Sequence, residues 1–258
     1  MHFKSHANIP VFVPHMGCPH LCVFCDQKSI SGEKDELTPE KAQNQIEEAL
    51  STLQGRRAEI AFFGGSFTAI EREKMIAFLA LASSYLKSGR VSGIRLSTRP
   101  DCVDEEILDI LSFYGVSAVE LGVQSLDEEV LKASGRRHSV KDTADACARI
   151  KQRGCFLLGC QMMLGLPAST REKELLTARE ICRMGADCTR IYPTVVLKDT
   201  PLEALWKKGL YRPLSLEEGV LRGADCFEIF ENAGVKVLRM GLCAEESCRE
   251  QAVAGCYH

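Results

Sequence analysis

Cys18, Cys22 and Cys25 form a C-x3-C-x2-C triplet, and this spacing constrains the chain more than any other feature. Three thiolates cannot saturate a four-iron cluster, because one iron is left without a protein ligand. Structural metal sites fill every coordination position with protein ligands, whereas sites that do chemistry keep one position open. The triplet therefore predicts a 4Fe-4S cluster that binds a further molecule at its fourth iron.

The residues around the triplet leave two other interpretations open. A zinc knuckle would need a fourth ligand, which His15, His20 or Asp26 could supply, although zinc ribbons usually contain two C-x2-C pairs. Three reduced thiols in a protein core are the other interpretation. The apolar stretch 9–14 before the triplet predicts a strand, and a glycine and a proline beside the cysteines suit a loop that wraps a cluster.

Composition narrows the class of protein. The 258 residues include 13 cysteines, but the N-terminus carries no signal peptide, so reduced thiols in a cytoplasmic protein are the simplest reading. No apolar run approaches the length of a membrane span. The net charge of −3 argues against a strongly basic nucleic-acid module and leaves room for a local basic patch. We therefore expect a cytoplasmic enzyme.

Strand-like and helix-like segments alternate along the chain, which predicts parallel strands joined by crossover helices. The strand candidates are 9–14, 60–63, 94–97, 118–123, 157–163 and 190–196, and the helix candidates are 39–53, 71–87, 104–113, 139–153, 170–185 and 215–233. Glycines and polar residues follow the strands, at the active-site rim of a barrel. We expect an α/β fold, a partial (β/α)6 TIM-like barrel. Its core domain spans 1–245, and a C-terminal extension spans 246–258, where the ending is abrupt and the chain could be incomplete.

These motifs carry a family resemblance. The cysteine triplet, with Phe24 before its last member, resembles the radical S-adenosylmethionine (SAM) superfamily. Residues 8–245 resemble the radical domain of the Elongator catalytic subunit. The segments that carry this likeness are Gly64 to Thr68, Ser97 to Asp101, Glu120 to Ser125, Gly165 to Pro167 and Ile191 to Val196. Oxygen-independent coproporphyrinogen oxidases share the stretch Leu121 to Gln124, but the segment Tyr192 to Thr194 favours the Elongator side.

The resemblance implies two cofactors. The three cysteines would bind three irons of a 4Fe-4S cluster. The amino and carboxylate groups of S-adenosyl-L-methionine would chelate the fourth iron, and its cleavage would release a 5′-deoxyadenosyl radical. The residues implied to contact this cofactor are Phe24, Gly64, Gly65, Ser66, Ser97, Gln124, Arg136 and Gln161. No residue is assigned to the catalytic step itself.

The glycine pair and Phe24 each have a plainer interpretation. Gly64 and Gly65 would let the backbone approach the methionine end of the cofactor, so Gly65→Val is expected to weaken cofactor binding and leave the iron content unchanged. A plain strand-to-helix turn would also explain them. Phe24 would pack near the adenine, or simply belong to the core.

The polar candidates also have alternatives. Gln124 and Arg136 would hold the ribose and the carboxylate, while a solvated basic loop would equally explain Arg136 to His138. Ser97 stands where some radical enzymes place an acid, so its contact with the cofactor would be weaker than a carboxylate's. The Elongator-like pattern also has Ser-Thr there. The role of Gln161 is similarly open.

The resemblance implies modification of tRNA, of the wobble-uridine type. The Elongator catalytic subunit carries an acetyltransferase domain for which this chain has no room. Radical chemistry on a small molecule such as a porphyrinogen is therefore the alternative enzyme function. An iron–sulfur binding or electron-transfer module is a third, against which Gly64, Gly65 and Gln124 argue. The implied partners are a reductase or flavodoxin-type electron donor, tRNA, and an acyltransferase partner in trans.

Two further groups of residues stay open. Cys243, Cys248 and Cys256 could hold a metal, but their irregular spacing favours unrelated thiols. Phosphate binding would need several basic residues on one face. The basic candidates are Arg56, Arg57, Arg136, Arg137, Arg153, Lys207, Lys208 and Arg212.

Overall fold

The structure is a computed structural model that describes residues 7–13, 16–18, 22–26, 37–53, 56–242 and 246–256. For residues 246–248 it describes the backbone alone. His15, His20 and Cys243 lie outside the described residues, so their predicted roles as ligands stay untested.

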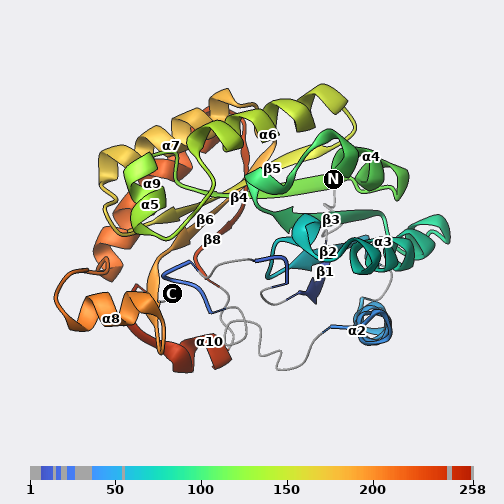
Figure 1. Cartoon of the computed structure of the whole chain (residues 1–258), viewed down its shortest axis with the longest axis horizontal. Coiled ribbons are helices and arrows are strands. Elements are labelled where there is room, and N and C mark those ends of the chain that lie inside the picture. The colour runs from blue at the N-terminus through green and yellow to red at the C-terminus, as the bar shows by residue number, and fades with distance from the viewer. Residues whose placement is uncertain are drawn as a thin grey trace.

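A parallel sheet of seven strands forms the centre of the fold, in the order β1-β2-β3-β4-β5-β6-β8, and curves into a half-barrel (Figure 1). The strands are β1 (Ala7–Phe12), β2 (Ala58–Phe63), β3 (Gly93–Thr98), β4 (Ala118–Gln124), β5 (Leu157–Leu164), β6 (Cys188–Pro193) and β8 (Lys236–Met240). Every neighbouring pair is parallel. The predicted partial barrel is confirmed, with β8 as an additional edge strand.

Helices cross over between the strands on the convex side of the sheet (Figure 1). The long ones are α2 (Pro39–Thr52), α3 (Arg72–Lys87), α4 (Glu105–Phe113), α6 (Val140–Arg153), α7 (Arg171–Arg183) and α9 (Leu216–Asn232). Side-chain oxygens of Thr38, Asp104, Ser139, Thr170 and Ser215 accept backbone N–H groups at five of their N-termini. These caps define where the helices begin, close to the predicted starts. Within the described chain, no helix combines the length and apolar character that crossing a membrane requires.

The short elements lie at the strand ends. They are η1 (Phe67–Ala69), η2 (Pro100–Cys102), α5 (Glu128–Ala133), α8 (Pro201–Lys207) and α10 (Glu246–Gln251).

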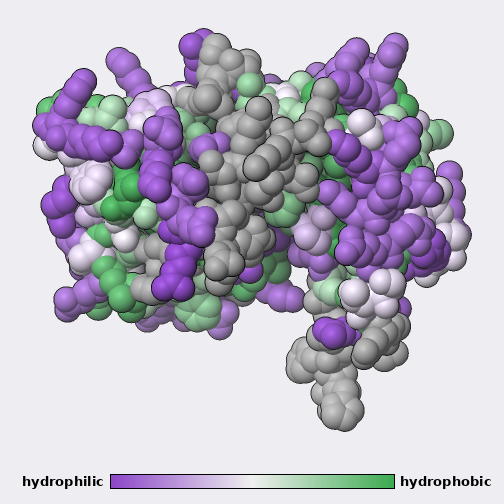
Figure 2. All heavy atoms as spheres, turned by 90° about the horizontal axis from the view of Figure 1, so that it is seen from below, coloured by the Kyte–Doolittle hydropathy of each residue, from purple (hydrophilic) through white to green (hydrophobic). Residues whose placement is uncertain are grey.

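Seen from below, hydrophilic side chains cover much of the described surface, and hydrophobic atoms form interrupted patches between them (Figure 2). The strand ends and the loops that follow them, rather than the crossover helices, carry the candidate site residues.

The two faces of the sheet differ in chemistry because side chains alternate along a strand. Fully buried apolar residues such as Phe62, Leu96 and Leu121 belong to the main hydrophobic core. The alternate positions on neighbouring strands carry the buried charges Arg95 and Glu120. The concave face is therefore polar at its centre, as expected of an interior that does chemistry.

The predicted strand 190–196 is wrong as a single strand. β6 ends at Pro193, and β7 (Val195–Leu197) pairs antiparallel with β9 (Ala252–Gly255) in a separate two-stranded sheet. Proline lacks the N–H that would continue the ladder, and Thr194 N instead donates to Leu164 O at 2.8 Å. Residues 252–255 thereby pack beside the end of the barrel.

Candidate functional site

Backbone hydrogen bonds fix the cysteine loop to the end of β2. Val13 N donates to Phe63 O at 2.7 Å, and Ser66 N donates to Met16 O at 3.0 Å. Cys18 therefore lies at the carboxyl ends of the first two strands. This is the rim where the active sites of such barrels are found.

Two glycines make this close contact possible. A Cβ at Gly17, whose φ is +71°, would lie 2.3 Å from the backbone oxygen of Ser66. A Cβ at Gly65 would lie 2.5 Å from the backbone oxygens of both Val13 and Met16. The backbone of the cysteine loop thus occupies the space beside Gly65 that the sequence predicted for the cofactor, because the two loops interlock. Gly64, with φ of +91°, makes the turn itself.

The second half of the cysteine loop is held from the other side of the barrel. Cys25 N donates to Cys22 O at 3.0 Å, which makes a tight turn between the two thiols. Val23 N donates to Ser134 O after α5, and Leu202 N of α8 donates to Val23 O. The loop therefore bridges elements that are far apart in the sequence.

Phe24 packs into a small apolar cluster on this side. Its ring is partly buried against Val196 of β7, Leu202 of α8 and Tyr211, beside Trp206. This cluster anchors the turn that carries Cys22 and Cys25. The predicted contact between Phe24 and an adenine stays a prediction.

Arg136 reaches the cysteine loop from the segment between α5 and α6. Its Nη1 lies 3.5 Å from Cys22 Sγ, and its Nη2 donates to Gly122 O on β4. Its Nε is buried and has no hydrogen-bond partner among the described residues. The guanidinium thus lies between a thiol and the end of the fourth strand, instead of in a solvated loop.

The charges around the thiols suit an anionic cluster. Burial raises the pKa of Cys18, and the neighbouring Cys22 raises it further, while Arg99 and Arg136 lower it. The bare Cys18 thiol is therefore kept protonated, whereas bound iron would displace the proton. The two guanidiniums then offset the negative charge of the thiolates.

Gln124 at the end of β4 has an unusual backbone and an unpartnered side-chain oxygen. Its φ is +65°, which is uncommon for a residue other than glycine and costs about 1–3 kcal/mol. Its Oε1 is buried without a hydrogen-bond partner among the described residues. A buried acceptor of this kind fits a ligand that donates a hydrogen bond, such as a ribose hydroxyl.

The two serine candidates lie on neighbouring strand ends. Ser66 Oγ is 3.0 Å from Thr98 Oγ1 and accepts the backbone N–H of Arg99 at 3.2 Å. Its side chain therefore joins the turn after β2 to the end of β3. Ser97 is buried beside Thr98, and its contact with a cofactor stays a prediction.

A network of buried charges that the sequence did not predict crosses the concave face. Glu120 on β4, only 1% exposed, pairs with Arg95 of β3 at 2.6 Å and with Arg190 of β6 at 2.6 Å. Arg95 also pairs with Glu59 of β2 at 2.7 Å. Gln161 Nε2 donates to Glu120 Oε2 at 3.1 Å, so the fifth strand takes part as well. Charged residues at alternate positions of adjacent predicted strands were the available signal.

Opposing effects set the ionisation of Glu120. Burial raises the pKa of this carboxyl group, but the hydrogen bond and charge of Arg190 and the charge of Arg95 outweigh it and hold the pKa below its ordinary value. Arg190 also stacks over the ring of Phe63, with 5.1 Å from its central carbon to the ring centroid. Glu120 is therefore ionised within the network.

The remaining candidate ligands do not form a second site in the part of the chain that the structure describes. No three described His, Cys, Asp or Glu side chains lie close enough to hold a single metal ion, and none of the eleven described cysteine side chains is in a disulfide. Asp26, which the sequence offered as a zinc ligand, already interacts with another group of the protein. Cys256 is buried near Gly219, whose added Cβ would meet its sulfur at 2.6 Å. The side chain of Cys248 is not described.

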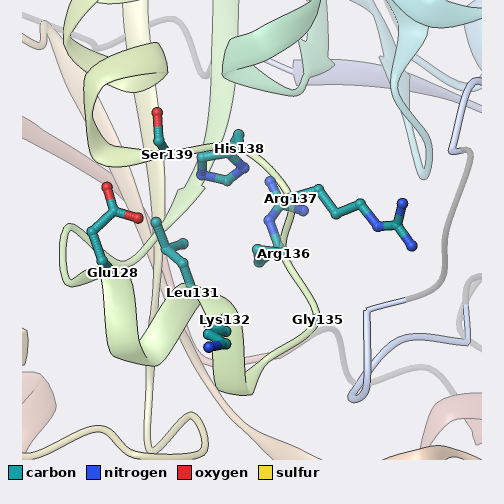
Figure 3. A pocket seen from close by; sticks show the side chains of 8 residues that line it. All are labelled: Glu128, Leu131, Lys132, Gly135, Arg136, Arg137, His138 and Ser139. Carbon is teal, nitrogen blue, oxygen red and sulfur yellow. The ribbon is translucent and has the colours of Figure 1, made fainter.

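A cavity of about 410 Å³ lies next to Arg136. Figure 3 shows its lining: Glu128, Leu131 and Lys132 come from α5, and Arg136, Arg137 and His138 come from the loop that leads to α6. The cavity is therefore continuous with the group that touches Cys22.

Two family profiles match almost the whole chain. Residues 12–181 match the profile described as Radical SAM superfamily. Residues 186–258 match the Radical_SAM C-terminal domain.

Individual relatives and structures agree with these profiles. An uncharacterized protein of Methanocaldococcus jannaschii is 30% identical over 86% of this chain and 71% of its own length. A tRNA uridine(34) acetyltransferase of Dehalococcoides mccartyi is 28% identical over 80% of this chain and 52% of its own length. The structure of Methanocaldococcus infernus Elp3 with an N-terminal deletion has a TM-score of 0.72 at 23% identity. It covers 98% of this chain, which spans 60% of that one.

Proposed function

Because the chain belongs to the radical S-adenosylmethionine superfamily, we propose that Cys18, Cys22 and Cys25 bind three irons of a 4Fe-4S cluster. The fourth iron would take the amino and carboxylate groups of S-adenosyl-L-methionine. When bound and reduced by one electron, this pair of cofactors supplies a 5′-deoxyadenosyl radical that abstracts a hydrogen atom from the substrate.

The contact between Arg136 and Cys22 carries this proposal. It joins the cysteine loop to the end of β4, where Gln124 holds an acceptor that no described residue partners. The thiols of Cys18 and Cys22 and the guanidiniums of Arg99 and Arg136 interact at this end of the barrel, which supports the proposal. This donor set fits an anionic cluster and a ligand that has both a carboxylate and hydroxyl groups.

The chain's own residues would orient the cofactor in distinct ways. Arg136 would hold the carboxylate, and Gln124 would accept a ribose hydroxyl. Ser97 and Gln161 would line the same wall of the barrel, and Phe24 would fix the turn that carries two of the thiols. Ser66 and the Gly64-Gly65 turn would act indirectly, by holding the cysteine loop and the end of β3 in place.

We propose that the substrate is tRNA at a wobble-type uridine. Relatives named as tRNA uridine(34) acetyltransferases support this substrate class, although this chain spans only about half of the Dehalococcoides protein. A flavodoxin-type protein or a reductase would supply the electron. An acyltransferase partner in trans is the proposed source of an acyl group.

Two assays test the proposal in sequence. Anaerobically reconstituted protein with S-adenosyl-L-methionine and a reductant should release 5′-deoxyadenosine, and a Cys22→Ala variant should not. Mass spectrometry of tRNA nucleosides from a deletion strain should then show a modified uridine lost and restored by the parent gene but not by the Cys22→Ala gene. An unchanged nucleoside profile, with 5′-deoxyadenosine still formed, would refute the tRNA substrate while leaving the radical chemistry intact.

A further inference from the structure

The cavity between α5 and α6 contains polar groups that the fold itself does not satisfy. His138 is 2% exposed, and its Nδ1 has no hydrogen-bond partner among the described residues. Arg136 Nε is also buried and also lacks a hydrogen-bond partner among the described residues. Buried polar atoms normally have partners, so two unsatisfied ones in the lining of one cavity point to a ligand.

The protonation state of His138 determines which chemical group can be the missing hydrogen-bond partner of its Nδ1. Burial and the charge of Arg136 lower the pKa of His138 to about 4, so the ring is neutral at pH 7. Its Nε2 lies 3.2 Å from Val123 O, which can only accept, so Nε2 carries the hydrogen. Nδ1 is then an acceptor, and the missing partner is a donor such as a hydroxyl group.

The charge of the side chains that line the cavity indicates the charge of the ligand. Three cations, Lys132, Arg136 and Arg137, face one carboxylate, that of Glu128. The Glu128 carboxylate already accepts the backbone N–H of Val140. A net positive lining favours an anion. It disfavours S-adenosyl-L-methionine as the occupant, because sulfonium and ammonium groups outnumber its carboxylate.

The two outer cations, Lys132 and Arg137, have no carboxylate partner among the described residues. Both side chains are exposed. Several other exposed arginines are neutralised by carboxylates: Arg72 by Glu106, Arg90 by Glu47, Arg171 by Asp225, and Arg212 by Glu218. Cations left unpaired at the mouth of a cavity are suited to phosphate groups.

We propose that this cavity binds the ribose-phosphate backbone of the RNA substrate, with a 2′-hydroxyl donating to His138 Nδ1 and the adjacent phosphate on Arg137 and Lys132. The inference rests on the proposed tRNA substrate and adds its docking point beside the cysteine loop. A 2′-hydroxyl is the group by which a protein distinguishes RNA from DNA. The site would therefore select ribose directly.

Binding of an anticodon stem-loop RNA and its all-deoxy counterpart to anaerobically reconstituted protein tests this inference, by fluorescence anisotropy at several salt concentrations. Arg137→Ala and Lys132→Ala should each weaken RNA binding roughly tenfold and reduce the slope against log salt by about 1. His138→Gln keeps an N–H toward Val123 O but has a carbon atom at the position of Nδ1, with its carbonyl oxygen one bond further out, so it should abolish the preference for RNA over DNA. Lys141→Ala on α6, where Lys141 pairs with Asp145, removes the same charge and should change nothing.

The outcomes separate this inference from the proposed function. RNA binding that is salt-sensitive but unchanged in Arg137→Ala, Lys132→Ala and His138→Gln would overturn the docking point and leave the tRNA substrate standing. Variants that lose affinity for S-adenosyl-L-methionine but not for RNA would assign the cavity to the cofactor. A parent protein with no salt-sensitive RNA binding would overturn both proposals.

Discussion

Arg136 Nη1 lies 3.5 Å from Cys22 Sγ, although the two residues are 114 positions apart in the sequence. The contact exists because two short segments meet: the turn that holds Cys22 and Cys25, and the loop between α5 and α6. Hydrogen bonds from Val23 to Ser134 and from Leu202 to Val23 hold them in place. Arg136 can therefore contact both the Cys22 thiol and a ligand bound at the end of β4.

Substitution of Arg136 should separate cofactor binding from cluster assembly. Arg136→Lys keeps a positive charge near Cys22 but loses the planar fork that can hold a carboxylate in two places. We expect the iron content to stay near that of the parent and the affinity for S-adenosyl-L-methionine to fall roughly tenfold. Equilibrium dialysis with labelled cofactor measures the affinity, and unchanged affinity would remove Arg136 from the cofactor site.

Gly65 should matter for the cysteine loop itself. In Gly65→Ala the new Cβ would lie 2.5 Å from the backbone oxygens of Val13 and Met16, so the loop must move. We expect a loss of about 1–3 kcal/mol in the free energy of unfolding and a clear fall in bound iron. Urea denaturation and iron analysis measure the two effects.

Gly223→Ala provides the matched control. Gly223 lies inside α9, where an added Cβ would meet the Met240 sulfur at 3.4 Å, an ordinary contact. Alanine also has the higher helix propensity, so stability should be equal or slightly greater. If Gly65→Ala kept full iron content and lost only cofactor affinity, the sequence-based expectation would be correct and the interlocked loops irrelevant.

Glu120 should be the residue whose charge stabilises the barrel most. Glu120→Gln leaves Arg95 and Arg190 buried without their shared counter-ion, which should cost about 3–5 kcal/mol in urea unfolding at pH 7. Glu106→Gln removes the same charge from an exposed pair with Arg72 and should cost less than about 1 kcal/mol. Equal costs for the two variants would contradict the network.

The difference in the free energy of unfolding between the parent and Glu120→Gln should shrink as the pH falls. Because the pKa of Glu120 is lowered in the folded state, its contribution is complete above the unfolded pKa, near 4.5, and is lost as the pH falls through the lower folded value. The parent and Glu120→Gln should therefore converge in stability only under strongly acidic conditions.

His138 should make the protein less stable at mildly acidic pH. Burial and Arg136 lower its pKa from 6.5 to about 4, so the unfolded chain binds a proton that the folded chain does not. Stability from this group is complete above pH 6.5 and falls as the pH drops toward 4, by about 2 kcal/mol between pH 7.5 and pH 5. Chemical denaturation of the parent and His138→Gln at both pH values should show this difference only in the parent.

The cysteine spacing and the alternation of elements predicted the fold well, because both are local signals. The strand predicted at 9–14 overlaps β1, which spans Ala7–Phe12, and the polar ends of the strands came together at one rim. The break after Pro193 was missed because the apolar pattern continues through Val196, and only the pairing of β7 with β9 separates the two strands.

The candidate site was less predictable because its contacts are long-range. Charged residues at alternate positions of the predicted strands indicate a polar face, but they do not show that Glu120 pairs with both Arg95 and Arg190, because the three residues lie on different strands. Lys207 pairs with Glu203 at 2.8 Å, so it is a paired surface charge that a count of basic residues cannot distinguish from Arg137. The reason for a glycine at position 65 also lies in another loop, because the backbone oxygens of Val13 and Met16 leave no room for a Cβ there.

Electron paramagnetic resonance of the reduced, reconstituted protein tests the central claim most directly. The parent should hold about four irons and four sulfides per chain and show a 4Fe-4S signal that changes when S-adenosyl-L-methionine is added. Alanine at Cys18, Cys22 or Cys25 should abolish the signal, whereas alanine at Cys182 of α7 or Cys226 of α9 should leave it intact. A signal that survives in all three loop variants, or that never responds to S-adenosyl-L-methionine, would contradict the account.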